Sequence, residues 1–357
     1  MTRLWLQLIC CLLFWSGLSI ADTRYQSVLQ NTLTHYIVPA YAELTQATGL
    51  LQQQIDTLCD DPSGKHLMAA QQAFQTTVQA WSGVEWFRLG PVMEAHRVER
   101  FFFFPDRKSI GLRQVQAALI RQDSALLDPH HLPQQSIALQ GIGALDYLLF
   151  GTGADTLQTQ GGYRCRLAGS ISQNLYQIAT HLHTDWQQNA TLRADWLHPT
   201  ATNPLFRTDQ AAMNRFIGLL IHGLEAIRDT RLQAFLRATP QQDRPKSAPL
   251  WRSQATLALI TDGLTGLQRL FEQSQITMLL PPDMRQLANN IQFEFAQSIR
   301  VAHALSATPV ATLLSNPAQR DQLLQLQRNL QFLINRLNHE LAPRLGLMAG
   351  FSFGDGD

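Results

Sequence analysis

The sequence predicts an all-α protein built from two four-helix bundles. Nearly every long segment repeats its apolar residues with the 3.6-residue period of an α-helix, and no segment sustains the alternation that is typical of a β-strand. Pro199 and Pro204 mark a break in this pattern between residues 191 and 207, with about four predicted helices on each side. We therefore expect one bundle over residues 22–190 and a second over residues 191–357, and their similar make-up suggests a duplication.

The predicted helices follow one another in order, separated by proline, glycine or polar segments. The first contains Pro39, which should kink it because proline lacks the amide that its turn needs. The second ends at Leu89-Gly90-Pro91, and the segment 92–108 after it shows no clear period. We expect helices at about residues 24–58, 65–87, 109–121, 134–150, 162–188, 209–238, 253–275, 283–307 and 317–341.

The first 21 residues have the three parts of a secretory signal peptide. Arg3 supplies a positive charge, residues 4–18 form an apolar block, and Ser19-Ile20-Ala21 places small residues where a signal peptidase cleaves. We predict cleavage near Ala21, export of the mature chain and no transmembrane anchor afterwards. The alternative, an uncleaved anchor, would need about 20 apolar residues, which is more than this block supplies.

Two cysteines, Cys59 and Cys165, remain in the mature chain. An exported protein meets an oxidising compartment, so we expect them to form a disulfide, with two buried free thiols as the alternative. The bridge would close a loop of about 100 residues and contribute up to about 4–5 kcal/mol in the chain-entropy model. Two thiols alone are too few for a closed zinc site.

The charge balance excludes one class of function. The whole chain carries a formal charge of +1, and only three of its 28 basic residues are lysines, the others being arginines scattered along the sequence. Such a chain has no general field that would attract nucleic acid or an anionic membrane. A local arginine pocket remains possible.

Two His-x-x-Glu pairs, His96/Glu99 and His222/Glu225, are candidate metal ligands. Residues three apart share one face of a helix, so each pair could bind one metal jointly, as in di-iron bundles. The alternative is an ordinary hydrogen-bonded pair on a helix surface. The zinc-protease sequence His-Glu-x-x-His is absent from the chain.

Charged and aromatic residues crowd together on either side of Gly90-Pro91. Four successive phenylalanines, Phe101 to Phe104, cannot all face one way in a helix, so some must pack between elements or line a cleft. One interpretation is an apolar pocket rimmed by charge, which is the usual form of a ligand site. The other is a buried connector between the halves with its charges paired. The charged residues concerned are Glu85, Arg88, Arg97, Arg100, Asp106 and Arg107.

Several segments together resemble the imelysin-like family of exported helical proteins linked to bacterial iron uptake. They span almost the whole mature chain in family order: Trp81 to Gly90-Pro91, Phe104-Pro105-Asp106, the run from Gln140 to Gly151, Arg164-Cys165 to Trp186, and Leu345-Gly346 to Phe351 with Asp355-Gly356-Asp357. The resemblance implies two four-helix bundles, a site near their junction and a periplasmic location. The family has also been labelled a peptidase family, so the resemblance raises peptidase activity as an alternative.

The family motif Gly-x-His-x-x-Glu is altered in this chain. Gly141 matches the glycine, Gly143 stands at the histidine position, and Asp146 replaces the glutamate. Glycine has no ligand atom in its side chain, so the metal pair that the resemblance implies is reduced to one carboxylate. A peptidase that depends on that pair should not work here.

The leading hypothesis is a non-catalytic periplasmic protein that binds a ligand, a metal or a partner during iron uptake, with an envelope protein as the possible partner. A metallopeptidase with a rearranged metal site is the alternative, and a scaffold that bridges envelope proteins is a third hypothesis. The cofactor suggested is iron or another divalent metal, with Asp146, His96 and Glu99 as candidate ligands. The predicted ligand site comprises Glu85, Arg88, Arg97, Gly141 and Asp146, over which Asp355 and Asp357 would close.

Overall fold

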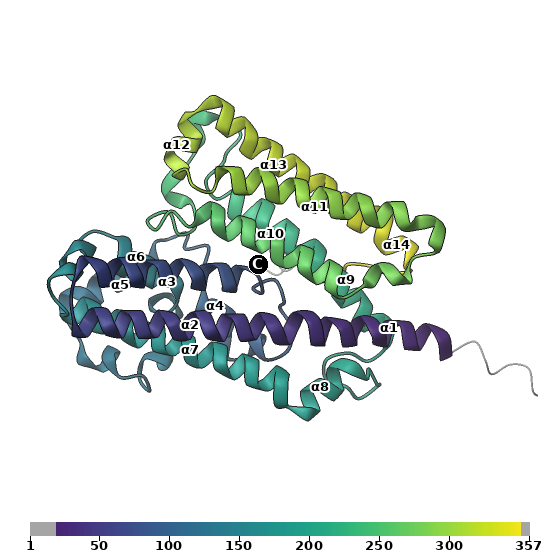
Figure 1. Ribbon diagram of the computed structural model, residues 1–357, viewed down its shortest axis with the longest axis horizontal. Helices are drawn as coiled ribbons and strands as arrows, with labels where there is room; N and C mark the ends of the chain where they lie inside the picture. The colour runs from purple at the N-terminus through teal and green to yellow at the C-terminus, as the bar shows by residue number, and fades with distance from the viewer. Residues whose placement is uncertain (1–18, 351–357) are drawn as a thin grey trace, which may run out of the picture.

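A computed structural model describes residues 19–350, and within that range the chain is helical and contains no β-strand. The predicted all-α class is therefore confirmed (Figure 1). The first half contains α1 (Ser19–Asn31), α2 (Val38–Asp60), α3 (Gly64–Ser82), α4 (Arg97–Phe101), α5 (Ile110–Arg121), α6 (Ile142–Phe150), α7 (Tyr163–Gln188) and α8 (Ala190–Leu197). The second half contains α9 (Asp209–Glu225), α10 (Thr256–Gln273), α11 (Arg285–Leu305), α12 (Val310–Ser315), α13 (Pro317–Asn335) and α14 (Ala342–Arg344).

The longest helical run joins α1 to α2 through a π-helical turn, η1 (Thr32–Ile37), and Pro39 is the second residue of α2. A π turn changes the local hydrogen-bond pattern, so the missing proline amide is accommodated without ending the helix. Similar π segments, η7 (Ala226–Leu232) and η12 (Arg336–Leu341), follow α9 and α13. The start of the run also reaches the second half, because the guanidinium of Arg24 donates to the carbonyl of Met278 at 2.7 Å.

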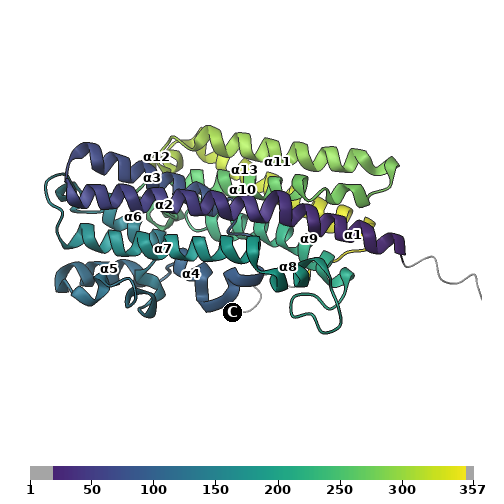
Figure 2. The same ribbon diagram turned by 60° about the horizontal axis from the view of Figure 1, so that its bottom comes forward.

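The helices pack in a sequence that carries the core from one half into the other. α2 packs against α3 and α7, α3 packs against α10, and α10 and α13 both pack against α11. Figures 1 and 2 both place α11 and α13 on one side of the molecule and α7 on the other, with α2 and α10 between them. Gly266 of α10 lies so close to the turn after α3 that a Cβ there would stand 2.2 Å from the Gly83 carbonyl oxygen. The junction of the halves is therefore a backbone-to-backbone contact.

Two helices are shorter than the sequence predicts. α3 ends at Ser82, and the carbonyl of the next residue, Gly83, accepts the hydroxyl of Tyr36 at 2.8 Å. α6 begins only at Ile142, because Gly141 has a φ of +97° and a Cβ there would lie 2.5 Å from the Phe101 carbonyl oxygen. Such a conformation favours glycine and cannot continue a helix. The end of α3 and the start of α6 both lie near the junction of the two halves.

The predicted disulfide is present: Cys59 at the end of α2 is bonded to Cys165 near the start of α7. None of the helices between residues 19 and 350 combines the length and apolarity needed to cross a bilayer. Most of the predicted signal peptide, residues 1–18, lies outside the described residues, as do Asp355 and Asp357.

Candidate functional site

The four successive phenylalanines separate into two groups. Phe101 stacks on Trp81 with ring centroids 4.1 Å apart. Phe102 stacks on Phe104 at 5.5 Å, and the guanidinium carbon of Arg231 lies 4.7 Å from the centroid of each of these two rings. Arginine over aromatic faces is a favourable cation–π arrangement, and it is stronger where water is excluded. A cation from the second half thus lies against aromatic rings from the first.

Arg231 is paired with a carboxylate that the sequence singles out. Its Nη2 donates to Oε2 of Glu85 at 2.7 Å, and each residue is only 3% exposed. Burial lowers the pKa of Arg231, while the charge of Glu85 opposes this and that of Arg88 adds to it. Removing one member of such a buried pair typically costs about 3–5 kcal/mol, because the other charge is left without compensation.

Several polar atoms of this cluster have no hydrogen-bond partner among residues 19–350. They are Oε1 of Glu85, Nε and Nη1 of Arg231, and the indole Nε1 of Trp86. An unsatisfied buried polar group costs about 1–3 kcal/mol, and such groups in native proteins commonly face a bound water, ion or ligand. We call this arrangement of Glu85, Trp86 and Arg231 with Phe102 and Phe104 the Arg231 centre. Its unpaired atoms are one acceptor oxygen and three donor nitrogens.

The altered motif position lies beside this centre. Gly143 is exposed, and the one described atom within 4 Å of a Cβ built there would be Cε2 of Phe102, at 4.0 Å. Space for a side chain therefore exists at position 143, next to a ring that Arg231 covers. Gly143 itself supplies neither a donor nor a ligand atom.

Asp146, three residues further along α6, has other partners. It is 2% exposed; Oδ1 accepts the backbone N–H of Ser253 at 3.0 Å, and Oδ2 lies 3.7 Å from Nη1 of Arg252. Burial raises the pKa of Asp146, and the contacts with Ser253 and Arg252 oppose that rise. This carboxylate holds α6 to the segment that precedes α10, and so it too joins the halves.

Three of the other charged residues have structural hydrogen bonds, which are local for Arg97 and Asp106 and long-range for Arg100. Arg97, the first residue of α4, donates to the carbonyl of Pro91 at 2.5 Å and so closes the turn that ends at His96. Arg100 donates to the side chains of Gln140 at 3.0 Å and Asn174 at 2.9 Å. The carboxylate of Asp106 accepts the first free amides of α5, those of Ile110 and Gly111. Of the predicted ligand set, Glu85 belongs to the Arg231 centre, and Arg88 is near enough for its charge to lower the pKa of Arg231. Arg97 and Asp146 make the contacts given above.

The predicted metal ligands are not gathered. His222 forms a 2.9 Å contact from Nδ1 to Glu225, while its Nε2 lies 3.1 Å from the carbonyl oxygen of Ala349. His96 is exposed at the start of α4. Within residues 19–350 no three histidine, cysteine, aspartate or glutamate side chains come together in a group that could hold a metal ion. Among the described residues, Gly143 offers no ligand atom at the motif position, and both carboxylate oxygens of Asp146 are engaged by Ser253 and Arg252.

Comparison with known proteins places this sequence in a family. The family model described as imelysin, of the peptidase M75 group, matches residues 37–337. The chain belongs to the imelysin family. It is 22% identical over 327 residues to iron-regulated protein A of Synechococcus elongatus, a match that covers 88% of this chain and 85% of that protein.

Two solved structures share the imelysin fold of this chain. An imelysin-like protein from Psychrobacter arcticum aligns with a TM-score of 0.76 at 20% identity, covering 92% of this chain and 98% of that one. A candidate iron-regulated protein A precursor from Parabacteroides distasonis aligns with a TM-score of 0.70 at 11% identity, covering 90% and 96%. At these identities the structures establish the fold alone.

Sequence reasoning missed Arg231 and Arg252, two arginines of the second half that contact buried carboxylates of the first. Arg231 continues the apolar spacing of Leu224 and Ile227 in α9 and η7, so a charged residue at a core position was the available signal. Arg252 lies in an irregular segment between Trp251 and Ser253, where no periodicity indicates burial.

Proposed function

We propose that this imelysin-family protein is a non-catalytic periplasmic binding protein of iron uptake, and that its ligand binds at the Arg231 centre. The observation that carries the proposal is the set of buried donors and acceptors of Glu85 and Arg231 that lack a partner among the described residues. Unpaired buried polar groups destabilise the folded state, and a bound ligand that forms the missing hydrogen bonds removes this penalty.

The chemistry of the centre favours a ligand that carries hydrogen-bond acceptors. A guanidinium presents its N–H groups in a fixed plane that suits carboxylate oxygens, and Arg231 has Nε and Nη1 still available. An iron chelate with carboxylate arms has such oxygens. The names of two similar proteins, an iron-regulated protein A and an iron-regulated protein A precursor, support a link with iron.

The other predicted site residues contribute by position in this proposal. Arg88 adds a second positive charge near Arg231, and Gly141 lets the start of α6 approach Phe101 closely. Asp146 and Arg97 fix the segments that border the centre. The signal-like N-terminus supports export to the periplasm, and the absence of a ligand atom at Gly143 supports a non-catalytic role.

The test combines elemental analysis with a binding titration. The purified protein is incubated with ferrous iron, zinc or copper, desalted and analysed for metal, and it is titrated calorimetrically with ferric citrate. We expect no stoichiometric bare metal and saturable binding of ferric citrate. Retained metal together with chelator-sensitive cleavage of unfolded casein would instead establish the metallopeptidase alternative. Absence of ferric citrate binding would remove the proposed ligand class.

A further inference from the structure

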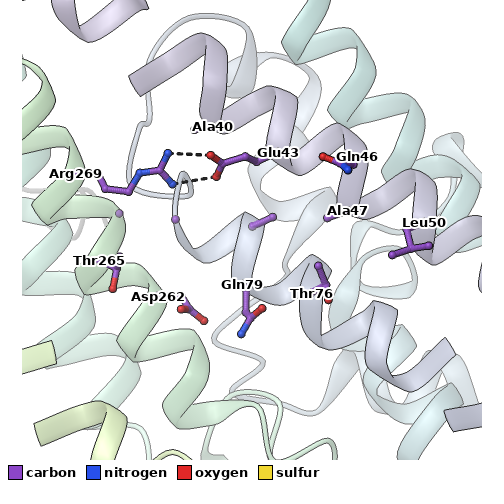
Figure 3. Close-up of a pocket in the computed structure, with 13 residues that line it drawn as sticks. Ala40, Glu43, Gln46, Ala47, Leu50, Thr76, Gln79, Asp262, Thr265 and Arg269 are labelled. Carbon is purple, nitrogen blue, oxygen red and sulfur yellow. Dashed lines mark hydrogen bonds and ion pairs between the residues drawn. The ribbon is translucent and has the colours of Figure 1, made fainter. Parts of the chain in front are cut away.

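A second pocket lies at the junction of the halves, between α2, α3 and α10 (Figure 3). Its volume is about 470 Å³, within the range of small-molecule sites. Its walls come from both halves: Glu43 from α2, Thr76 and Gln79 from α3, and Asp262, Thr265 and Arg269 from α10. It shares no lining residue with the Arg231 centre and is independent of the function proposed for that centre.

Two of the three charges in this pocket neutralise each other. Arg269 donates from both terminal nitrogens to the two carboxylate oxygens of Glu43, each at 2.9 Å, so this pair bridges α2 and α10. Figure 3 shows the pair at one end of the pocket. The carboxylate of Asp262 is then the remaining charge, and the lining carries a net charge of −1 at neutral pH.

Asp262 has an oxygen available for a ligand. Its Oδ2 is buried and has no hydrogen-bond partner among residues 19–350. Figure 3 shows Asp262 and Gln79 extending from facing helices into the space between α10 and α3. The amide of Gln79 and the hydroxyl of Thr265 add neutral hydrogen-bonding groups, and Ala40 and Leu50 add apolar wall.

This combination selects one class of ligand. A buried carboxylate oxygen without a partner favours a cation. A calcium ion would require six to eight oxygen ligands, and a single uncommitted carboxylate with a few neutral groups falls short of that. The apolar wall and the volume instead suit a charged group attached to a short hydrocarbon chain.

We propose that the Asp262 pocket binds a small organic cation, whose ammonium or guanidinium group pairs with Asp262 while its alkyl part lies against Leu50 and Ala47, which also lines the pocket. Gln79 and Thr265 hydrogen-bond to the head group. Because the walls belong to both halves, a bound cation also links α10 to α2 and α3.

The test is a ligand-observed NMR titration of the full mature protein with n-butylammonium and n-butylguanidinium, using n-butanol as the uncharged control. We expect saturable binding of at least one cation and none of the alcohol. Asp262→Asn, which preserves the shape of the side chain, should weaken cation binding at least tenfold. Asp283→Asn, at an exposed aspartate outside the pocket, should leave binding unchanged.

A second variant separates a folding defect from loss of the site. Leu50 lines the pocket and is 42% exposed, so Leu50→Trp should obstruct the pocket without removing core packing or charge. We expect it to reduce cation binding at least fivefold with an unchanged melting temperature. The proposal is overturned if neither cation binds saturably, if butanol binds as well as the cations, or if Asp262→Asn binds like the wild type.

Discussion

Asp146 and Glu85 are both buried carboxylates of the first half that meet an arginine of the second, yet their surroundings differ. Asp146 accepts the Ser253 amide and faces Arg252, so both of its oxygens have a partner. The pair of Glu85 with Arg231 leaves Oε1, Nε and Nη1 without one among the described residues. Burial and ion pairing are common to both carboxylates. What distinguishes a candidate binding centre is the unused hydrogen-bonding capacity.

The largest expected effect is at Glu85. Glu85→Ala should lower the free energy of unfolding by about 3–5 kcal/mol, because it leaves the buried guanidinium of Arg231 without its counter-charge. Urea-induced unfolding followed by circular dichroism measures this. A loss below about 1 kcal/mol would show that Arg231 finds another partner, and the distinction between the two carboxylates would fail.

Asp146→Ala should have a smaller effect on stability and little effect on binding. It removes the acceptor of the Ser253 amide, at a cost of about 1–3 kcal/mol for a buried donor left unsatisfied. The affinity of the Asp146→Ala protein for ferric citrate should fall less than tenfold, because Asp146 holds α6 in place and does not contact the ligand. A complete loss of binding in a folded Asp146→Ala protein would place Asp146 in contact with the ligand.

Gly143→His sharpens the same comparison. The site is exposed and open beside Phe102, so the imidazole fits, and replacing a helical glycine should change stability by no more than about 1 kcal/mol. We expect no stoichiometric zinc in elemental analysis, because Asp146 is already engaged by Ser253 and Arg252. Tight zinc binding by this variant would mean that Asp146 is free to act as a ligand.

The smallest effect is a pH dependence from the Asp262 pocket. Burial raises the pKa of Asp262 from its ordinary 3.8 to about 6, while His303 of α11 opposes the shift. Glu43 and Arg269, the other charged groups of the pocket, are paired. Since the folded state then binds the proton more tightly than the unfolded state, stability relative to Asp262→Asn should rise as pH falls from 7 to 5. Organic-cation binding should weaken over the same range.

Melting temperatures of the wild type and Asp262→Asn, measured in parallel between pH 5 and 7, check the stability part of this prediction. The melting temperature of the wild type should rise relative to that of Asp262→Asn as the pH falls from 7 to 5. A constant difference would contradict a raised pKa in the folded state.

The helices were predictable because each must bury a continuous apolar stripe, and that stripe is visible in the sequence. The stripe of α2, for example, includes Leu44, Leu51 and Ile55, all fully buried. The disulfide followed from the number of cysteines and the expected compartment. The ends of α3 and α6 were not predictable, because Gly83 and Gly141 contact residues that are distant in the sequence, Tyr36 and Phe101.

The candidate site was predictable only in part. Glu85 was found from the crowding of charge around Gly90-Pro91, but its partner Arg231 is 146 residues away, and no local pattern joins them. The same holds for Asp146 and Ser253, which are 107 residues apart. Such pairs depend on how the two halves dock, and that information is distributed over the whole interface.

The most direct test of the account is ferric citrate binding by a protein whose Arg231 centre has been made apolar. The double variant Glu85→Leu/Arg231→Met removes both charges together, and such replacements are often neutral or stabilising. The matched control is Asp243→Leu/Arg320→Met, which replaces a buried pair in which Arg320 makes three hydrogen bonds. We predict that the first variant folds but binds ferric citrate at least 100-fold more weakly, while the control binds like the wild type. Wild-type affinity in the Glu85→Leu/Arg231→Met protein would contradict the account.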